Sequence, residues 1–333
     1  MSEKSQFLKN WMEILRNCNY DNTYKMAWAK ALTEISLEMD STKHSQNSEL
    51  IEITLLQMAN KVLKYYWNQT IFFNLVQGSN PLKPPKILSL TKELIALYQE
   101  EKEDVKPERF EKAETEIKSN EDLNKQYIKI LRKIVTALKS DVSYRFLNLG
   151  RKKLEGIYNY NKGDDSLFIS YANLKTLKDN YEDIYETINY RWALILETFN
   201  TTPRICKKVK IIDEKGIKRK SLKRFMKYLD MDNPEHICFV CGRKVEEDLS
   251  IDHVIPWSYL YSDDLWNLVY VHRSCNSSKG NIVPNQLLIK RLEDRNKKLL
   301  RAVEYGKSDK VVEELKVAVE NNYVYKLWTS CQG

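Results

Sequence analysis

Two pairs of metal-binding side chains, separated by thirty residues, constrain this 333-residue chain more than any other feature. Cys238 and Cys241 form the first pair, with two residues between them. His272 and Cys275 repeat that spacing. Thiolate and imidazole groups in two such pairs suit the tetrahedral site of a structural Zn²⁺. We therefore expect a small domain in which the zinc ion replaces part of the hydrophobic core that so short a segment cannot build.

A second group of polar residues lies between the two pairs: Asp252 and His253 follow an apolar run, and Asn267 and Asn276 come later. Histidine can take a proton from water near neutral pH, so His253 is the candidate general base. Carboxylate and amide oxygens bind hard cations such as Mg²⁺, which makes Asp252 and Asn276 candidate ligands. Neighbouring strand residues point to opposite faces, so Asp252 and His253 can serve an ion and a water separately. Asn267 is the candidate brace of the loop that carries His253.

This segment resembles the ββα-metal domain of the HNH endonuclease family. The resemblance rests on thirteen residues between His253 and Asn267, eight between Asn267 and Asn276, the phrase DHVIPWS and the ending Cys-Asn-Ser-Ser-Lys. It implies Mg²⁺-dependent hydrolysis of DNA that leaves 5′-phosphate and 3′-hydroxyl ends, with the roles given above. Two positions depart from the family pattern: Asn276 stands where some members carry a histidine, and His272 where many carry a cysteine.

Other interpretations of the same residues stay open. A Cys-x-x-Cys pair can be two buried thiols, His253 can be a core histidine, and Asn267 alone is an ordinary turn residue. Lys279 and Arg273 are candidate phosphate contacts, but they can equally be solvated charges. A non-catalytic zinc module that binds nucleic acid would explain the two pairs of metal-binding side chains. It would leave Asp252, His253 and Asn276 without a role.

Positive charge is concentrated just before this segment. The net charge is +8, and residues 204–227 hold eleven Lys and Arg against two acidic residues. We expect a hairpin with arms at 204–212 and 217–220, followed by a short basic helix at 221–229. A solvated face is the plain alternative to a phosphate-binding one. The candidate nucleic-acid contacts here are Lys218, Arg219, Lys220, Lys223 and Arg224.

The remainder of the chain predicts helices. The sequence has only 9 Gly and 8 Pro, which favours long regular elements, and apolar residues recur at helical spacing. One stripe runs from Ile51 to Tyr65, and a last helix is expected over 309–328. Segment 100–120 is expected to be an exposed helix or connector, and residues 157–169 a small hairpin of the kind found in winged-helix DNA readers.

The predicted fold class is mostly α, with a helical N-terminal domain and a small zinc-stapled ββα-metal nuclease domain flanked by C-terminal helices. The predicted domains are a recognition or regulatory domain at 1–200, a basic hairpin and linker at 201–235, and the nuclease domain at 236–333.

The predicted function is a metal-dependent DNA endonuclease of bacterial restriction or phage defence, with RNA as an alternative substrate. The N-terminal domain would recognise DNA, or would bind a regulatory partner or small signal. Three cysteines (Cys18, Cys206 and Cys331) are scattered singly, which favours a reducing compartment. The start of the chain lacks a signal-peptide pattern, so a cytoplasmic protein without membrane contact is expected.

Overall fold

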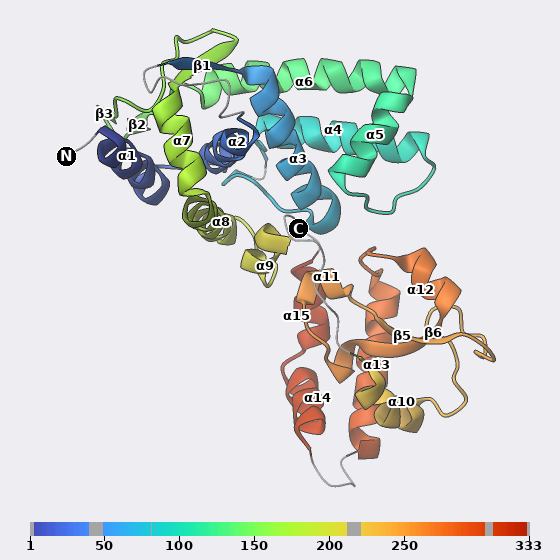
Figure 1. Cartoon of the computed structure of the whole chain (residues 1–333). Coiled ribbons are helices and arrows are strands. Elements are labelled where there is room, and N and C mark those ends of the chain that lie inside the picture. The colour runs from blue at the N-terminus through green and yellow to red at the C-terminus, as the bar shows by residue number, and fades with distance from the viewer. Residues whose placement is uncertain (1–2, 40–48, 81, 212–220, 304–308, 332–333) are drawn as a thin grey trace. The chain divides into compact units, whose positions relative to one another are not determined.

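A computed structural model of the chain describes residues 3–39, 49–80, 82–211, 221–303 and 309–331, and these are mostly helical (Figure 1). The chain divides into two compact units. The first unit contains residues 1–71 and 75–200, and the second contains residues 72–74 and 201–333. The predicted fold class is confirmed, because the C-terminal part holds a β-hairpin and a cluster of three cysteines and one histidine between flanking helices.

Eight helices and four short strands make up the described part of the first unit. The helices are α1 (Glu3–Asn17), α2 (Tyr24–Glu38), α3 (Leu55–Phe73), α4 (Lys86–Glu101), α5 (Phe110–Ser119), α6 (Glu121–Asp141), α7 (Tyr171–Asp179) and α8 (Tyr181–Glu197). The strands are β1 (Leu50–Thr54), β2 (Asn148–Leu149), β3 (Lys152–Lys153) and β4 (Ser166–Ser170).

The core of the first unit is rich in aromatic side chains that the sequence places at helical spacing. Trp11, Trp28, Trp67 and Trp192 are fully buried, and they lie on four different helices. Tyr65 and Trp192 meet edge to face with their ring centroids 5.9 Å apart. Large rings that contact each other in this way bury much apolar area and tie helices of the unit together.

Two expectations for the first unit are wrong. Ile51 lies in strand β1, where it pairs with Ile169 of β4, and the helix begins only at Leu55. The hairpin expected at 157–169 is reduced to a single bridge between Asn159 and Phe168, so the winged-helix interpretation fails. In both cases strand β4 takes a partner more than a hundred residues away in sequence, and local periodicity cannot reveal such a partner.

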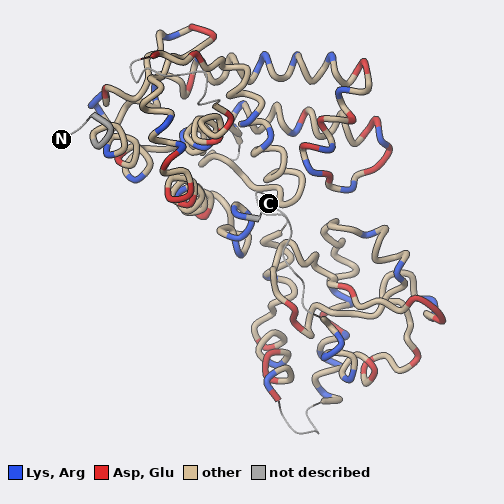
Figure 2. Tube along the Cα trace, viewed as in Figure 1, with Lys and Arg blue, Asp and Glu red and all other residues tan. Residues whose placement is uncertain are grey.

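Segment 100–120 was expected to be an exposed helix or connector, and most of it is. Residues 102–106 are exposed and lie outside any helix, and residues 110–119 form helix α5, of which only Phe110, Ala113 and Ile117 are buried, on one face. Lys and Glu are mixed along α5, whereas α6 begins with acidic residues and carries mainly Lys and Arg after them (Figure 2). The pairs on α5 include the i,i+4 pair of Lys118 with Glu114 at 2.8 Å. Such pairs stabilise the solvated side of a helix only slightly, so the buried face positions α5.

The second unit surrounds one β-hairpin, in which β5 (Leu249–His253) pairs with β6 (Leu268–His272) in antiparallel register. Asp252 lies opposite Val269, and His253 lies opposite Leu268. The other elements are α9 (Ile205–Ile211), η1 (Lys223–Phe225), α10 (Met226–Asp232), α11 (Trp257–Leu260), η2 (Leu265–Asn267), α12 (Arg273–Lys279), α13 (Gln286–Val303), α14 (Lys310–Glu320) and α15 (Tyr323–Thr329).

The basic stretch differs from its prediction where the structure describes it. Its first arm is helix α9 and not a strand, because Ile205 and Val209 are spaced to bury one helix face. Lys208 of this helix is fully buried, with Nζ 5.3 Å from the ring centroid of Tyr259, and burial lowers its pKa to about 8. This cation is therefore interior. The expected turn and second arm, with Lys218, Arg219 and Lys220, lie outside the described residues.

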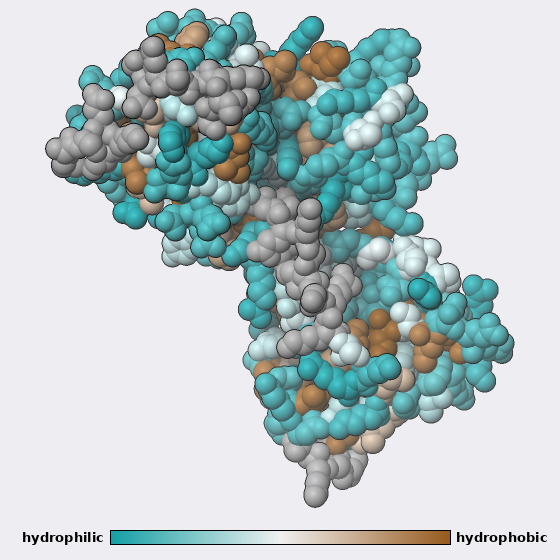
Figure 3. Space-filling model, viewed as in Figure 1, coloured by the Kyte–Doolittle hydropathy of each residue, from teal (hydrophilic) through white to brown (hydrophobic). Residues whose placement is uncertain are grey.

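The expected helix at 309–328 is two helices, α14 and α15. Asn322 separates them with a left-handed backbone (φ 59°), a conformation that a continuous α-helix cannot contain. In the part of the chain that the structure describes, no helix combines the length and apolar character needed to cross a membrane. The visible face carries mostly hydrophilic side chains with separate hydrophobic patches (Figure 3).

Candidate functional site

The two spaced ligand pairs meet in one cluster. The ligand atoms of Cys238, Cys241, His272 and Cys275 all lie within 4.8 Å of one another. Nδ1 of His272 is 3.4 Å from Sγ of Cys241 and 3.9 Å from Sγ of Cys275. A tetrahedral zinc site holds sulfur and nitrogen ligands about 3.5 Å apart, from the usual Zn–S and Zn–N bond lengths. The donor set and its spacing fit a structural zinc ion.

His272 is oriented by a contact on the other side of its ring. Its Nε2 lies 3.2 Å from the carbonyl oxygen of Lys244. When Nε2–H donates to this carbonyl, the lone pair of the imidazole is on Nδ1, which faces the sulfur atoms. The histidine that replaces the more usual cysteine is thus placed as the third predicted ligand.

A backbone hydrogen bond stabilises the turn that carries Cys238 and Cys241. The N–H of Gly242 donates to the carbonyl of Cys238 at 2.9 Å, and Gly242 has a φ of 74°, which favours glycine. The backbone N–H of Arg243 lowers the pKa of Cys241 to about 6. Cys241 is therefore largely a thiolate at neutral pH, the form that binds zinc.

The candidate catalytic residues lie where helix α12 packs against strand β5. Nδ2 of Asn276 donates to Oγ of Ser250 at 3.2 Å, and Nζ of Lys279 donates to Oδ2 of Asp252 at 2.7 Å. Ser250 and Asp252 are alternate residues on one face of the strand, and the two helix residues are three apart on one face of α12. The structure thus brings Asp252 and Asn276 to the same strand–helix contact.

Each of these two residues keeps one oxygen without a hydrogen bond among the described residues. Lys279 donates to Oδ2 of Asp252, whereas Oδ1 accepts no hydrogen bond within the described part of the chain. Asn276 uses its Nδ2 to reach Ser250, so its Oδ1 points away from that bond. A carboxylate oxygen and an amide oxygen in this state are suitable ligands for a hard divalent ion.

His253 has a partner that the sequence analysis missed. Its Nε2 lies 3.1 Å from Oδ1 of Asp263, and the two side chains are only 7% and 14% exposed. A carboxylate at this distance fixes the orientation of the imidazole. Asp263 belongs to a Ser-Asp-Asp stretch of ordinary loop composition, so the only signal was its place in the segment between His253 and Asn267.

Asn267 makes the contacts that a brace requires. It is fully buried, and its amide forms two hydrogen bonds of 2.8 Å with the backbone of Ile255, one accepted from N–H and one donated to C=O. Its own carbonyl accepts from the N–H of Val254 at 2.9 Å. These three bonds hold the two residues that directly follow His253.

Two family models match the chain. A domain of unknown function (DUF8808) matches residues 4–199, more than half of the chain, and an HNH endonuclease model matches residues 243–285. The chain belongs to the DUF8808 family. Residues 243–285 are an HNH endonuclease domain, so the predicted resemblance is confirmed. No curated protein and no solved structure matched.

Helix α13 supports the HNH domain from beneath the hairpin. The guanidinium of Arg295 donates to the carbonyl of Leu268, and Nδ2 of Asn296 donates to the carbonyl of Trp266 at 2.8 Å. Both side chains are buried, and their acceptors flank Asn267. Their role was not predicted from the sequence, because polar residues on an amphipathic helix normally face solvent.

The predicted phosphate contacts occupy different environments. Lys279 is only 12% exposed and donates to both Asp252 and the backbone carbonyl of His253, so it lies inside the site. Arg273, Lys223 and Arg224 are exposed. Contact of these residues with nucleic acid stays a prediction.

Loss of the metal cluster is expected to unfold the HNH domain. The wild-type protein should retain about one zinc ion per chain. Cys275→Ser removes one thiolate ligand, so the purified variant should contain no zinc. Elemental analysis measures the metal, and near-ultraviolet circular dichroism measures the loss of packing. Cys206→Ser is the matched control, because Cys206 is exposed and outside the cluster. Equal zinc content in the two variants would contradict the ligand assignment.

Asn267→Ala is expected to destabilise the HNH domain by about 3 kcal/mol, because it leaves a buried N–H and C=O of Ile255 without partners. Urea denaturation of the second unit measures this change. Asn276→Ala provides the comparison, since Asn276 is only partly buried and should cost much less. Similar losses for both would show that Asn267 is no brace.

Proposed function

We propose that the HNH domain is a metal-dependent endonuclease that hydrolyses phosphodiester bonds in DNA. The observation that supports this most is the strand–helix contact of β5 and α12, where Asp252 and Asn276 each keep an oxygen that has no hydrogen bond to any residue the structure describes. His253 follows Asp252 directly and has a carboxylate partner of its own. A purely structural zinc module would need none of these side chains.

Asp252 and Asn276 would hold the catalytic ion, Mg²⁺ or a similar divalent cation. When bound, such an ion supplies positive charge that polarises the phosphate and stabilises the leaving oxygen. Lys279 contributes by donating to Oδ2 of Asp252, which would leave Oδ1 for the ion. Structural zinc in the Cys₃His cluster would take no part in the chemistry.

His253 is the proposed general base. With its proton on Nε2, shared with Asp263, the neutral imidazole can accept a proton from water on Nδ1. The imidazole then becomes a cation, and the adjacent carboxylate of Asp263 stabilises that charge. Asp263 acts through His253 and is a positioning residue. Asn267 keeps the backbone after His253 fixed during the reaction.

Exposed cations of the second unit would bind the phosphates that flank the cleaved bond. Arg273 begins helix α12, and Lys223 and Arg224 belong to η1. Lys218, Arg219 and Lys220 are proposed for the same role from their charge alone. Such contacts position a strand without selecting a sequence.

The larger assignment is also a proposal. Residues 1–200 would recognise DNA or receive a regulatory partner or signal, residues 201–235 would link the parts, and residues 236–333 would cut. A nuclease with a separate recognition or sensing domain suits bacterial restriction or phage defence. Digestion of DNA in several methylation states distinguishes the two roles of residues 1–200. Discrete fragments favour DNA recognition, and inactivity or smearing favours regulation by a partner or signal.

His253→Ala is expected to abolish Mg²⁺-dependent nicking of plasmid DNA, with a fall in rate of at least about 100-fold. The variant should keep its zinc, because His253 is not a cluster ligand. Parallel assays with single-stranded DNA and RNA identify the substrate. Undiminished cutting by the variant would refute the proposed base, and RNA cleavage alone would refute DNA as the substrate.

Asp263→Asn is expected to lower the cleavage rate about 10- to 100-fold through a misoriented imidazole. The concentration of Mg²⁺ for half-maximal activity should not change, because Asp263 contacts His253 and not the proposed ion ligands. Asp264→Asn is the matched control. Equal rates for the two variants would remove Asp263 from the mechanism.

A further inference from the structure

Positive charge in residues 1–200 is concentrated in one continuous segment, residues 123–154. This segment holds nine Lys and Arg against a single acidic residue, Asp141. The other residues of 1–200 hold 20 Lys and Arg against 27 Asp and Glu. A cationic segment in otherwise acidic surroundings attracts a negatively charged partner and determines where that partner binds.

Helix α6 carries five of these cations on its solvent side: Lys125, Lys129, Arg132, Lys133 and Lys139. At 3.6 residues per turn, the five positions fall within about a third of the helix circumference. The buried side chains of α6, from Leu123 to Leu138, take the opposite side. The helix therefore presents a row of positive charge along its exposed length.

The cations on α6 have few strong partners. In the described part of the chain, Lys129 and Arg132 are exposed and form no ion pair. Lys133 lies 3.4 Å from Glu93, and Lys139 lies 2.7 Å from Asp165. The acidic partner is exposed in both pairs, and such surface pairs contribute little. A phosphate group could therefore bind along α6 at small cost.

The β2–β3 hairpin, which follows α6 after a turn at 142–147, adds three consecutive cations. Arg151, Lys152 and Lys153 are all exposed, and none has an ion pair or a side-chain hydrogen bond with a residue that the structure describes. Gly150, with a φ of 58°, allows the two-residue turn between the strands. The tip of the hairpin is thus a second exposed group of cations.

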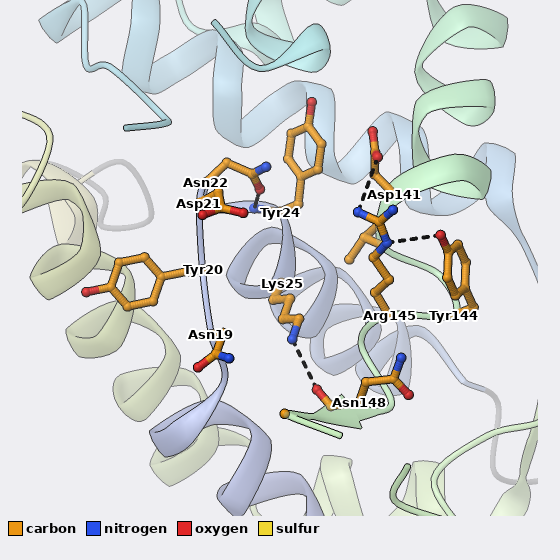
Figure 4. A pocket seen from close by; sticks show the side chains of 12 residues that line it. Asn19, Tyr20, Asp21, Asn22, Tyr24, Lys25, Asp141, Tyr144, Arg145 and Asn148 are labelled. Carbon is orange, nitrogen blue, oxygen red and sulfur yellow. Dashed lines mark hydrogen bonds and ion pairs between the residues drawn. The ribbon is translucent and has the colours of Figure 1, made fainter. Parts of the chain in front are cut away.

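The base of this hairpin is fixed to the unit. The N–H of Leu154 donates to the carbonyl of Leu147 at 2.8 Å, and both side chains are buried. Nζ of Lys25 donates to the carbonyl of Asn148 at 3.2 Å (Figure 4). A hairpin held in this way presents its cations without a large ordering cost on binding.

We propose that the exposed cations of α6 and of the β2–β3 hairpin bind the phosphate backbone of duplex DNA. The inference rests on the DNA-recognition role proposed for residues 1–200, and it does not require cleavage by the HNH domain. Phosphate contacts hold a duplex without reading its bases. The surface would therefore bind DNA of any sequence.

The segment lacks the exposed rings on which a single strand would stack its bases. Tyr127 and Phe146 are buried. Tyr144 lies against two cations, with its ring centroid 5.4 Å from Arg145 Cζ and 4.9 Å from Lys162 Nζ. A duplex, which presents mainly its phosphates, fits the segment better.

The segment also lacks the apolar surface that a membrane or a protein partner would use. Among residues 123–154, all of which the structure describes, Ile128 alone is an exposed large hydrophobic residue. Helices that lie on membranes insert a broad apolar face, and the centre of a protein interface is largely apolar. A row of cations without such a face favours a polyanion.

Fluorescence anisotropy of the full chain tests the proposal with a labelled duplex of about 20 base pairs, long enough at about 3.4 Å per pair to span α6 and the hairpin. Divalent ions are left out so that the DNA stays intact. The helix pair Lys129→Gln/Arg132→Gln and the hairpin pair Arg151→Gln/Lys152→Gln should each weaken binding roughly 10-fold. Each pair should also lower the slope of log affinity against log salt by about 2, one for each lost phosphate contact.

Lys83→Gln/Lys106→Gln is the matched control, because both lysines are exposed in loops outside residues 123–154. Unchanged affinity and salt slope in either test pair, or an equal loss in the control, would overturn the proposal. Tighter binding of single-stranded DNA or duplex RNA of the same length would overturn duplex DNA as the partner. Failure of the nuclease proposal is distinguishable, because the wild-type protein would then bind the duplex but would not nick plasmid DNA with Mg²⁺.

Discussion

The Cys₃His cluster constrains the whole C-terminal site, because its ligands come from the ends of the elements that carry the chemistry. His272 is the last residue of β6, and Cys275 lies in the first turn of α12. One ion bound to both would fix the angle between strand and helix. Asn276 follows Cys275 directly, so the metal cluster would also set the position of a proposed catalytic ligand.

A second level of support comes from hydrogen bonds that buried side chains make to the backbone. Asn267 holds the residues after His253, while Arg295 and Asn296 of α13 hold the backbone on either side of Asn267. Burial lowers the pKa of Arg295 to about 10, which reflects the cost of placing a guanidinium in the interior. Buried polar groups of this kind fix one backbone arrangement, because any other would leave them without partners.

The N-terminal unit is stabilised mainly by packing of aromatic side chains. Its helices meet through large buried rings, and the cations proposed to bind DNA lie on the solvent side of α6 and on the hairpin that follows it.

Sequence alone determined the features that depend on residue type and short spacing. Cysteine and histidine pairs predicted the metal cluster, and thirteen- and eight-residue intervals predicted the HNH domain, because that fold is short and its ligands are nearly fixed by distance along the chain. Helical periodicity likewise predicted most of the helices.

Tertiary structure decided what depends on contacts between distant segments. Strand β4 pairs with β1, the carboxylate of Asp263 contacts the imidazole of His253, and the ammonium of Lys279 donates to Asp252. Each of these residues is chemically ordinary where it stands in the sequence. Its role arises only when another segment supplies a partner within hydrogen-bonding distance, and the folded chain alone sets that distance.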